Sequence, residues 1–299
     1  MTRRPSAGGI AMFTGLSTAM FGALVAWTVS AQQPAPAQPQ ADVVSIGGSV
    51  TEIIVALGQQ HRLIARDATS TYPPDVQSLP DVGYMRALSP EGVLSVGPAL
   101  ILSTEGAGPP EALDVIRAAD VTYVEIPEAY SAEGILHKIA VVGDALGVPD
   151  RADGLASEVG AKLAAAQAQA DVAPEQRKRV LFVLSTQDGK INASGRGTAA
   201  DAMIRMAGGV NAVTEFDGYR QLTDEAVGLA APDVILMMNR SGDHAAENEA
   251  LFAMPAIRLT PAAETRSVVR MDGLLMLGFG PRTADAVIAL QQALYGQSG

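Results

Sequence analysis

A tyrosine and an arginine stand two positions apart in the segment GYMR, residues 83–86, where a side chain could serve as a ligand. Tyr84 follows a Pro-containing loop and precedes LSPEGV, which has the pattern of a helix start. Loops carry function when a rigid scaffold holds them at a cleft. The phenol of Tyr84 could bind a ligand as easily as it could pack against the helix start, and its position alone leaves both interpretations open.

Motifs of common enzymes are not found around it. Metal sites need clustered ligands at set spacings, whereas His61, His137 and His244 lie far apart and are expected at the surface. The stretch ASGRGTAADAM, residues 193–203, places two glycines before a helix but lacks the Gly-Lys-Ser/Thr of a phosphate-binding loop. A Gly-x-Ser-x-Gly nucleophile elbow is also missing. We therefore expect a protein that is not an enzyme.

The elements that must position Tyr84 follow an alternating pattern of strand and helix. Apolar strands are expected at VVSIG, RLIARD, ALILS and VTYVEI in the first half, and at RVLFVLS and PDVILMM in the second. Helices are expected at SVTEIIVALG, GPPEALDVIRAAD and TAADAMIRMAGG. Strands that alternate with helices predict mainly parallel sheets flanked by helices, which is an α/β fold.

A long polar helix divides these two halves. The stretch RADGLASEVGAKLAAAQAQADV, residues 151–172, is rich in helix formers but has no full apolar face, which is typical of a connection between lobes. We expect an N-terminal lobe over residues 42–148, an interlobe helix over 149–173 and a C-terminal lobe over 174–299. The ligand cleft would lie between two similar lobes.

An internal repeat supports the similarity of the lobes. LSPEGVLSVGPALIL, residues 88–102, aligns without gaps to LTDEAVGLAAPDVIL, residues 222–236, with six of fifteen positions identical. Each copy has a Ser or Thr suited to cap a helix, an acid in the first turn, and a proline before a strand. Chance similarity between two helix–strand units remains the alternative.

The N-terminus predicts export. Residues 1–31 have arginines at positions 3 and 4, an apolar run and small residues before a cut near Ala31, as in a secretory signal peptide. An uncleaved membrane anchor is the alternative, and the arginine pair leaves the twin-arginine route open. Residues 32–41, QQPAPAQPQA, are expected to form a tether. The net charge of −11 argues against a nucleic-acid partner, and the absence of cysteine excludes a disulfide framework.

Several of these segments together resemble the periplasmic haem-binding proteins of bacterial haem-uptake ABC transporters. They are SIGGSVTEIIVALG, RDATSTYPPDVQSLPDVGYMR, GTAADAMIRMAGGVNAV and LLMLGFG. The resemblance runs over roughly residues 43–290. The first segment, SIGGSVTEIIVALG, and the Tyr-Pro-Pro loop are shared with cobalamin-binding and ferric-siderophore-binding proteins, while GYMR and LLMLGFG favour the haem-binding branch of the family. The resemblance implies a monomeric, periplasmic protein that carries haem b to the permease dimer of a transporter.

The resemblance implies that Tyr84 is the axial ligand of ferric haem. A phenolate is a hard anionic donor that suits Fe(III), and a free phenol has a pKa near 10, so a nearby cation must favour its charged form. Arg86 and Arg220 are the candidates, with Arg220 as the match to the family's arginine on the tyrosine oxygen. Gly83 would let the loop backbone approach the porphyrin. Tyr72 is expected to pack in its turn.

Two further expectations follow from the resemblance. Some relatives have a histidine at the position of Thr186 that helps to hold a second haem, and threonine is a poor iron ligand, so one haem is expected here. Glu91 and Glu225 match the glutamates, one on each lobe, that dock onto permease arginines, although each acid could simply complement its helix dipole. The alternatives are a ferric siderophore or a corrinoid as ligand, or an anchored haem-handling or metal-chelatase enzyme.

Overall fold

The computed structural model describes residues 41–239 and 244–296. The predicted signal peptide and nearly all of the predicted tether lie outside these residues. The helices of the described part are α1 (Gly48–Ala56), α2 (Pro90–Leu94), α3 (Pro110–Ala118), α4 (Ala132–Ala145), α5 (Pro149–Gln169), α6 (Ala199–Met206), α7 (Asp224–Ala230), α8 (His244–Ala253), α9 (Pro261–Glu264), α10 (Gly273–Leu277) and α11 (Thr283–Tyr295). In the part of the chain described, no helix is long and apolar enough to cross a membrane.

The first lobe is built on a parallel sheet with the strand order β2-β1-β3-β4. Its strands are β1 (Val43–Ile46), β2 (Leu63–Arg66), β3 (Leu100–Thr104) and β4 (Thr122–Ile126). Along β3, Leu100 and Leu102 face one core cluster and Ile101 faces another, as the two-residue period of a strand requires. The two central strands, β1 and β3, are therefore buried on both faces, which explains why they are mostly apolar in the sequence.

The second lobe is built on a mixed sheet with the order β10-β9-β5-β6-β8. Its strands are β5 (Arg179–Ser185), β6 (Ile191–Ser194), β8 (Tyr219–Leu222), β9 (Val234–Met238) and β10 (Val268–Met271), and the short β7 (Val210–Asn211) pairs with β5. Strands β10, β9 and β5 run parallel, whereas β6 is antiparallel to both β5 and β8. The mainly parallel α/β fold is confirmed, and this antiparallel extension was not predicted.

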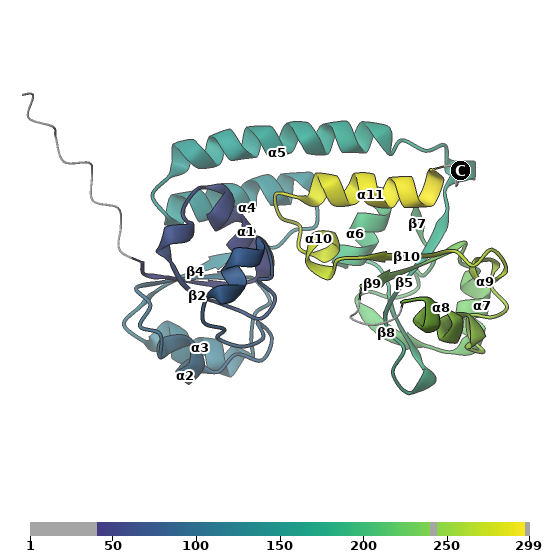
Figure 1. Cartoon of the computed structure of the whole chain (residues 1–299), viewed down its shortest axis with the longest axis horizontal. Coiled ribbons are helices and arrows are strands. Elements are labelled where there is room, and N and C mark those ends of the chain that lie inside the picture. Colours follow the sequence, from purple (N-terminus) through teal and green to yellow (C-terminus); the bar gives the residue numbers. More distant parts are fainter. Residues whose placement is uncertain (1–40, 240–243, 297–299) are drawn as a thin grey trace, which may run out of the picture. The chain divides into compact units, whose positions relative to one another are not determined.

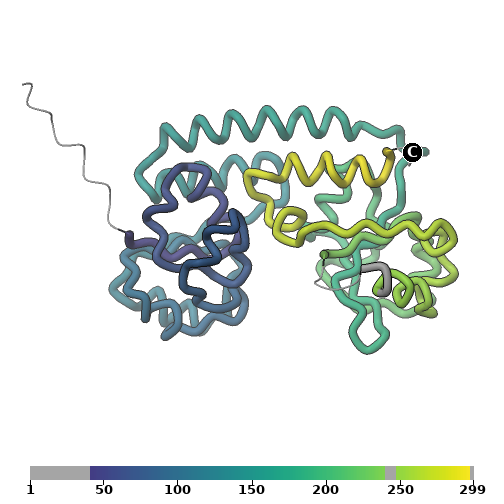
Figure 2. Tube along the Cα trace, viewed as in Figure 1, coloured from purple at the N-terminus to yellow at the C-terminus, as the bar shows by residue number. Residues whose placement is uncertain are grey.

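Helix α5 joins the lobes and runs along one side of both sheets, with α4 and α11 beneath it (Figure 1). Figure 2 follows the chain from the first lobe along α5 into the second. One core cluster contains Leu102 of the first sheet, Leu163 of α5, and Phe182 and Leu290 of the second lobe. The lobes therefore share a continuous apolar core below α5, which restricts their relative movement.

The close approach of α4 and α5 depends on a glycine. A Cβ atom at Gly143 would lie 2.2 Å from the Cβ of Ala152. Any larger side chain at position 143 would push the two helices apart, so this glycine is required by packing.

The two copies of the repeat form the same unit, a capped helix followed by a strand. Ser89 accepts a hydrogen bond from the Gly92 amide at the start of α2, and Thr223 accepts one from the Ala226 amide at the start of α7. The strands β3 and β9 follow these helices in the two lobes. The predicted caps are confirmed by these hydrogen bonds.

Candidate functional site

The loop that carries Tyr84 is held on its N-terminal side by pairing with the end of β2. Arg66 donates its amide to the Pro80 carbonyl at 3.0 Å, and the Val82 amide returns a hydrogen bond to the Arg66 carbonyl at 3.0 Å. One step further, the Ala68 amide donates to the Gly83 carbonyl at 2.9 Å. Residues 80–83 therefore form a short strand-like extension at the edge of the first sheet.

On its C-terminal side the same loop is held by a turn and by Gly108. The Ala87 amide donates to the Tyr84 carbonyl at 2.8 Å, which closes a turn over residues 84–87. The Gly108 amide donates to the Met85 carbonyl at 2.9 Å, and the Gly108 carbonyl accepts from the Leu88 amide at 2.9 Å. Tyr84 thus stands on a fixed backbone, and its side chain is 48% exposed. The phenol forms no hydrogen bond within residues 41–239 and 244–296.

Gly83 is required at its position by backbone conformation. Its φ of +102° lies in a region that residues with a Cβ rarely adopt. Its amide donates to Asp81 Oδ1 at 2.8 Å, and Asp81 forms an ion pair with Arg66 at 2.8 Å. An added Cβ at Gly83 would meet no atom within 4 Å, so this side of the backbone is open to a ligand.

Two further tyrosines, one from each lobe, are influenced by the charge of Arg86. Tyr130, in the loop after β4, makes an edge-to-face contact with Phe279, with ring centroids 5.1 Å apart. Tyr219, on β8, makes a similar contact with Phe182 at 6.4 Å. Both tyrosines are 36% exposed. The sequence did not single out either of them.

The pKa values of these two tyrosines indicate that their side chains are neutral and do not act as anionic ligands. Burial, and then the negative charge of Glu128, raise the pKa of Tyr130 above its ordinary value. Burial also raises the pKa of Tyr219. The positive charge of Arg86 opposes both pKa shifts, which places Arg86 within electrostatic range of both lobes. At neutral pH the two phenols are therefore uncharged hydrogen-bond donors.

The two arginines expected to support Tyr84 have different surroundings. Arg86 is exposed and acts electrostatically on Tyr130 and Tyr219. Arg220 is exposed on β8, and its guanidinium lies over the ring of Phe216 at 5.1 Å from the centroid. Because the Tyr84 phenol forms no hydrogen bond in the described residues, its pairing with Arg220 stays a prediction.

A buried lysine joins the first lobe to the segment LLMLGFG of the second. The side chain of Lys138 on α4 is 0% exposed, and its Nζ donates to both carboxylate oxygens of Glu128, at 2.7 and 2.8 Å. It also donates to Ser49 Oγ at 3.2 Å and to the Phe279 carbonyl at 3.1 Å. Burial lowers the pKa of Lys138, and Glu128 opposes that shift. The lysine therefore fixes Phe279, against which Tyr130 packs.

A second ionic contact joins the lobes at Tyr72. Arg282, at the start of α11, donates through Nε to Glu52 Oε2 of α1 at 3.0 Å, and through Nη2 to the other oxygen. Its guanidinium also lies 3.6 Å from the centre of the Tyr72 ring, a cation–π contact. Burial raises the pKa of Glu52, although Arg282 opposes the shift. Tyr72 therefore does pack, but against an arginine of the other lobe.

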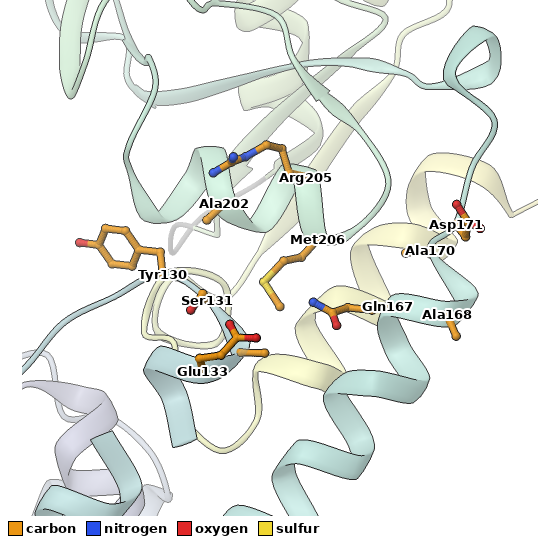
Figure 3. A pocket seen from close by; sticks show the side chains of 11 residues that line it. Tyr130, Ser131, Glu133, Gln167, Ala168, Ala170, Asp171, Ala202, Arg205 and Met206 are labelled. Atoms are coloured by element: carbon orange, nitrogen blue, oxygen red, sulfur yellow. The ribbon is translucent and has the colours of Figure 1, made fainter. Parts of the chain in front are cut away.

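A cavity of about 710 Å³ opens beside Tyr130 (Figure 3). Glu133 of α4, Gln167 of α5, and Arg205 and Met206 of α6 contribute to its walls. Because these walls carry charges of both signs, the cavity does not by itself define an anionic ligand.

The remaining predicted residues lie at the surface or at strand ends. Glu91 and Glu225 are both exposed on α2 and α7, where permease docking stays a prediction. Thr186 follows β5 and is half-buried. His61 and His137 are exposed as expected, and the side chain of His244 lies outside the described part. Among the described residues, His and carboxylate side chains form no cluster that could hold a metal ion.

A helix pattern could have revealed one missed residue. Ile135, Lys138, Ile139 and Val142 share the buried face of α4 at the spacing i, i+3, i+4, i+7, so a charged residue interrupts an apolar stripe. A lysine at such a position needs a buried partner. Tyr130 and Tyr219 have no such signal, because their contacts with Phe279 and Phe182 join residues that are far apart in the sequence.

The fold and this site define a two-lobed substrate-binding protein of the α/β class. The chain belongs to the Periplasmic binding protein family, which it matches over residues 43–274. Its structure is similar to the periplasmic haem-binding protein BhuT in complex with two haems, at 41% identity and a TM-score of 0.79, covering 86% of this chain and 98% of that one. It is also similar to the apo periplasmic haem-binding protein RhuT from Roseiflexus sp. RS-1, at 38% identity and a TM-score of 0.81, with the same coverage.

A curated relative binds a different ligand. The vitamin B12-binding protein of Yersinia pestis is 27% identical over 227 residues, which cover 74% of this chain and 77% of that protein. The protein is therefore a periplasmic substrate-binding protein of the class that serves haem, vitamin B12 and siderophores, and its family implies a permease partner. Members of this family bind ligands without transforming them, so the enzyme alternative is wrong.

Proposed function

We propose that this protein captures ferric haem in the periplasm and delivers it to the permease of an ABC importer. The observation that carries the proposal is Tyr84: a half-exposed phenol without a hydrogen bond in the described part, on a loop fixed at both ends. A phenolate oxygen is a suitable ligand for Fe(III). The similarity to two haem-binding structures at 38% identity or above supports the same ligand.

In this proposal the residues around Tyr84 have separate roles. Tyr84 binds the iron, Gly83 leaves the loop backbone open on the ligand side, and Arg86 supplies positive charge. Arg220 is the proposed partner of the tyrosine oxygen once haem is bound. The rings of Tyr130 and Tyr219, which are partly exposed, provide flat apolar surface for the porphyrin.

The shared core below α5 suits a largely preformed site. A ligand that binds without large domain closure loses less affinity to the ordering of the protein. Since Thr186 is a poor iron ligand, we propose one haem for each protein. Residues 1–31 would be removed on export, and Glu91 and Glu225 would contact arginines of the permease.

A corrinoid is the second candidate, because a curated relative is a vitamin B12-binding protein. Equilibrium titrations of the purified protein with ferric haem, cyanocobalamin and a ferric hydroxamate siderophore distinguish the ligands. The proposal predicts saturation by ferric haem at one equivalent and no saturable binding of the other two. Saturation by cyanocobalamin or the siderophore, with none by haem, would contradict it.

A further inference from the structure

A second cavity, which we call the Arg270 pocket, lies in the second lobe and has a volume of about 340 Å³. It is lined by Thr186, Gly189, Met237, Glu247, Ala250, Leu251, Met254 and Arg270. Thr186 follows the carboxyl end of β5, Met237 lies near that of β9, and Arg270 near that of β10. Ligands of open α/β sheets bind at the carboxyl ends of the parallel strands.

This edge of the sheet faces the other lobe. Strand β10 ends at Met271 and leads directly into α10 and the segment whose carbonyls accept hydrogen bonds from Lys138 of the first lobe. Figure 1 shows β10 running toward the first lobe and ending at α10. The pocket is therefore on the side of the second lobe where the interlobe ligand is expected.

Arg270 is a buried cation with unused hydrogen-bond donors. Its side chain is 9% exposed, and its Nε donates to Asn248 Oδ1 at 2.9 Å. Its Nη1 lies 3.5 Å from Glu247 Oε2, within ion-pair range, but this buried nitrogen has no hydrogen-bond partner in the described residues. A buried donor without an acceptor is unfavourable, so the guanidinium can gain by donating a hydrogen bond from Nη1 to a ligand oxygen.

The walls around Arg270 indicate the chemistry of that ligand. A guanidinium pairs best with a planar carboxylate, which it can hold through two parallel hydrogen bonds. The side chains of Met237, Leu251 and Met254 are apolar, and methionine adapts to irregular shapes. The carboxylate of Glu247 also lines this pocket and lies within ion-pair range of Arg270, so the charges of its walls do not by themselves define the ligand. The unused Nη1 donor of Arg270, together with the apolar walls, favours a carboxylate carried on an apolar body over a small inorganic anion.

We propose that the Arg270 pocket binds a propionate of the haem, with Arg270 as the carboxylate anchor on the second lobe. The inference rests on the proposed function, because it takes haem as the ligand. Tyr84 would then hold the iron from the first lobe while Arg270 holds the porphyrin edge from the second.

The test compares ferric haem with its dimethyl ester, in which both propionates are uncharged. The variant Arg270→Met is matched by Arg266→Met, which makes the same charge change at an arginine whose side chain is 55% exposed in the same lobe. A charge-assisted hydrogen bond corresponds to about a 10- to 150-fold change in affinity. We expect Arg270→Met to lower the affinity for haem by this factor and to leave the affinity for the diester unchanged. Arg266→Met should change neither.

The outcomes separate the two proposals. Unchanged haem affinity in Arg270→Met would overturn the anchor while leaving the proposed function in place. Equal losses for haem and the diester would show that Arg270 acts only by supporting the fold, and would also overturn it. A wild-type protein that binds neither compound would overturn the proposed function as well. Retained diester binding in Arg270→Met shows that the variant is folded.

Discussion

Replacement of Lys138 by methionine should destabilise the protein strongly, because it leaves a carboxylate of the interlobe contact unpaired. Methionine keeps most of the volume of the lysine stem, so packing changes little. The loss is the ammonium group, which bonds to both oxygens of Glu128, to Ser49 and to the Phe279 carbonyl. The Glu128 side chain is only 16% exposed and retains one long hydrogen bond, 3.3 Å, from Thr104.

Breaking a buried ion pair on one side costs about 3–5 kcal/mol. The partial exposure of Glu128 favours the lower limit, about 3 kcal/mol, which for a domain of this size lowers Tm by about 6–12 °C. Urea unfolding followed by circular dichroism measures the loss. The matched control is Lys162→Met, which removes an exposed ion pair to Glu158, also 2.7 Å long, on α5. Water screens that pair, so its loss should be far smaller.

A double variant tests whether the unpaired charge of Glu128 causes the loss of stability. Adding Glu128→Gln to Lys138→Met removes the unpaired charge, so it should recover part of the lost stability. If Lys138→Met were no less stable than Lys162→Met, the buried network would contribute nothing to the fold, and the reasoning would be refuted.

Three further predictions concern pH, packing and transport. Burial raises the pKa of Glu52, so the contribution of this carboxyl to stability is fully present below its ordinary pKa of 4.5 and is lost as the pH rises through the raised pKa. The free energy of unfolding, measured in urea at a series of pH values, should therefore fall over this range in the wild type and not in Glu52→Gln. The same pH dependence in both proteins would contradict the prediction. Gly143→Ala, which puts a Cβ 2.2 Å from Ala152, should lower the free energy of unfolding by about 1–3 kcal/mol, and an unchanged urea midpoint would refute the close helix contact. The double variant Glu91→Ala/Glu225→Ala should keep full haem affinity but stimulate permease ATPase activity less than the wild type; loss of haem binding instead would show that the docking assignment is wrong.

Much of the scaffold could be predicted because its signal is local. The apolar runs of β1, β3, β5 and β9 are largely buried on both faces of their sheets, and such strands are visible in the sequence as mostly apolar segments. The caps Ser89 and Thr223 act within three residues of their own position. By contrast, INAS and YRQL of β6 and β8 are short and polar, and they become strands only by pairing with β5 and with each other.

The site could be predicted only in part for the same reason. Tyr84 was singled out through its loop and motif, which are continuous in the sequence, and its role as a ligand stays a prediction. Tyr130 meets Phe279 across nearly 150 residues of chain, and Arg282 meets Tyr72 across more than 200, so no local pattern marks either pair. The unused donor of Arg270 is likewise invisible in the sequence, because only the folded structure shows that its Nη1 has no hydrogen-bond partner among the described residues.

The most direct test of the central claim is the visible absorption spectrum of the protein titrated with ferric haem, for the wild type and for Tyr84→Phe. The substitution removes one oxygen atom from a half-exposed side chain, so the fold should be unaffected. The wild type should saturate at one equivalent with the charge-transfer bands of high-spin, tyrosinate-bound iron. Tyr84→Phe should lose those bands and should also bind haem more weakly. Loss of a residue that only supports a metal ligand lowers affinity ~10–100-fold, and loss of the ligand itself should lower it further. The same bands and the same affinity in both proteins would contradict the account.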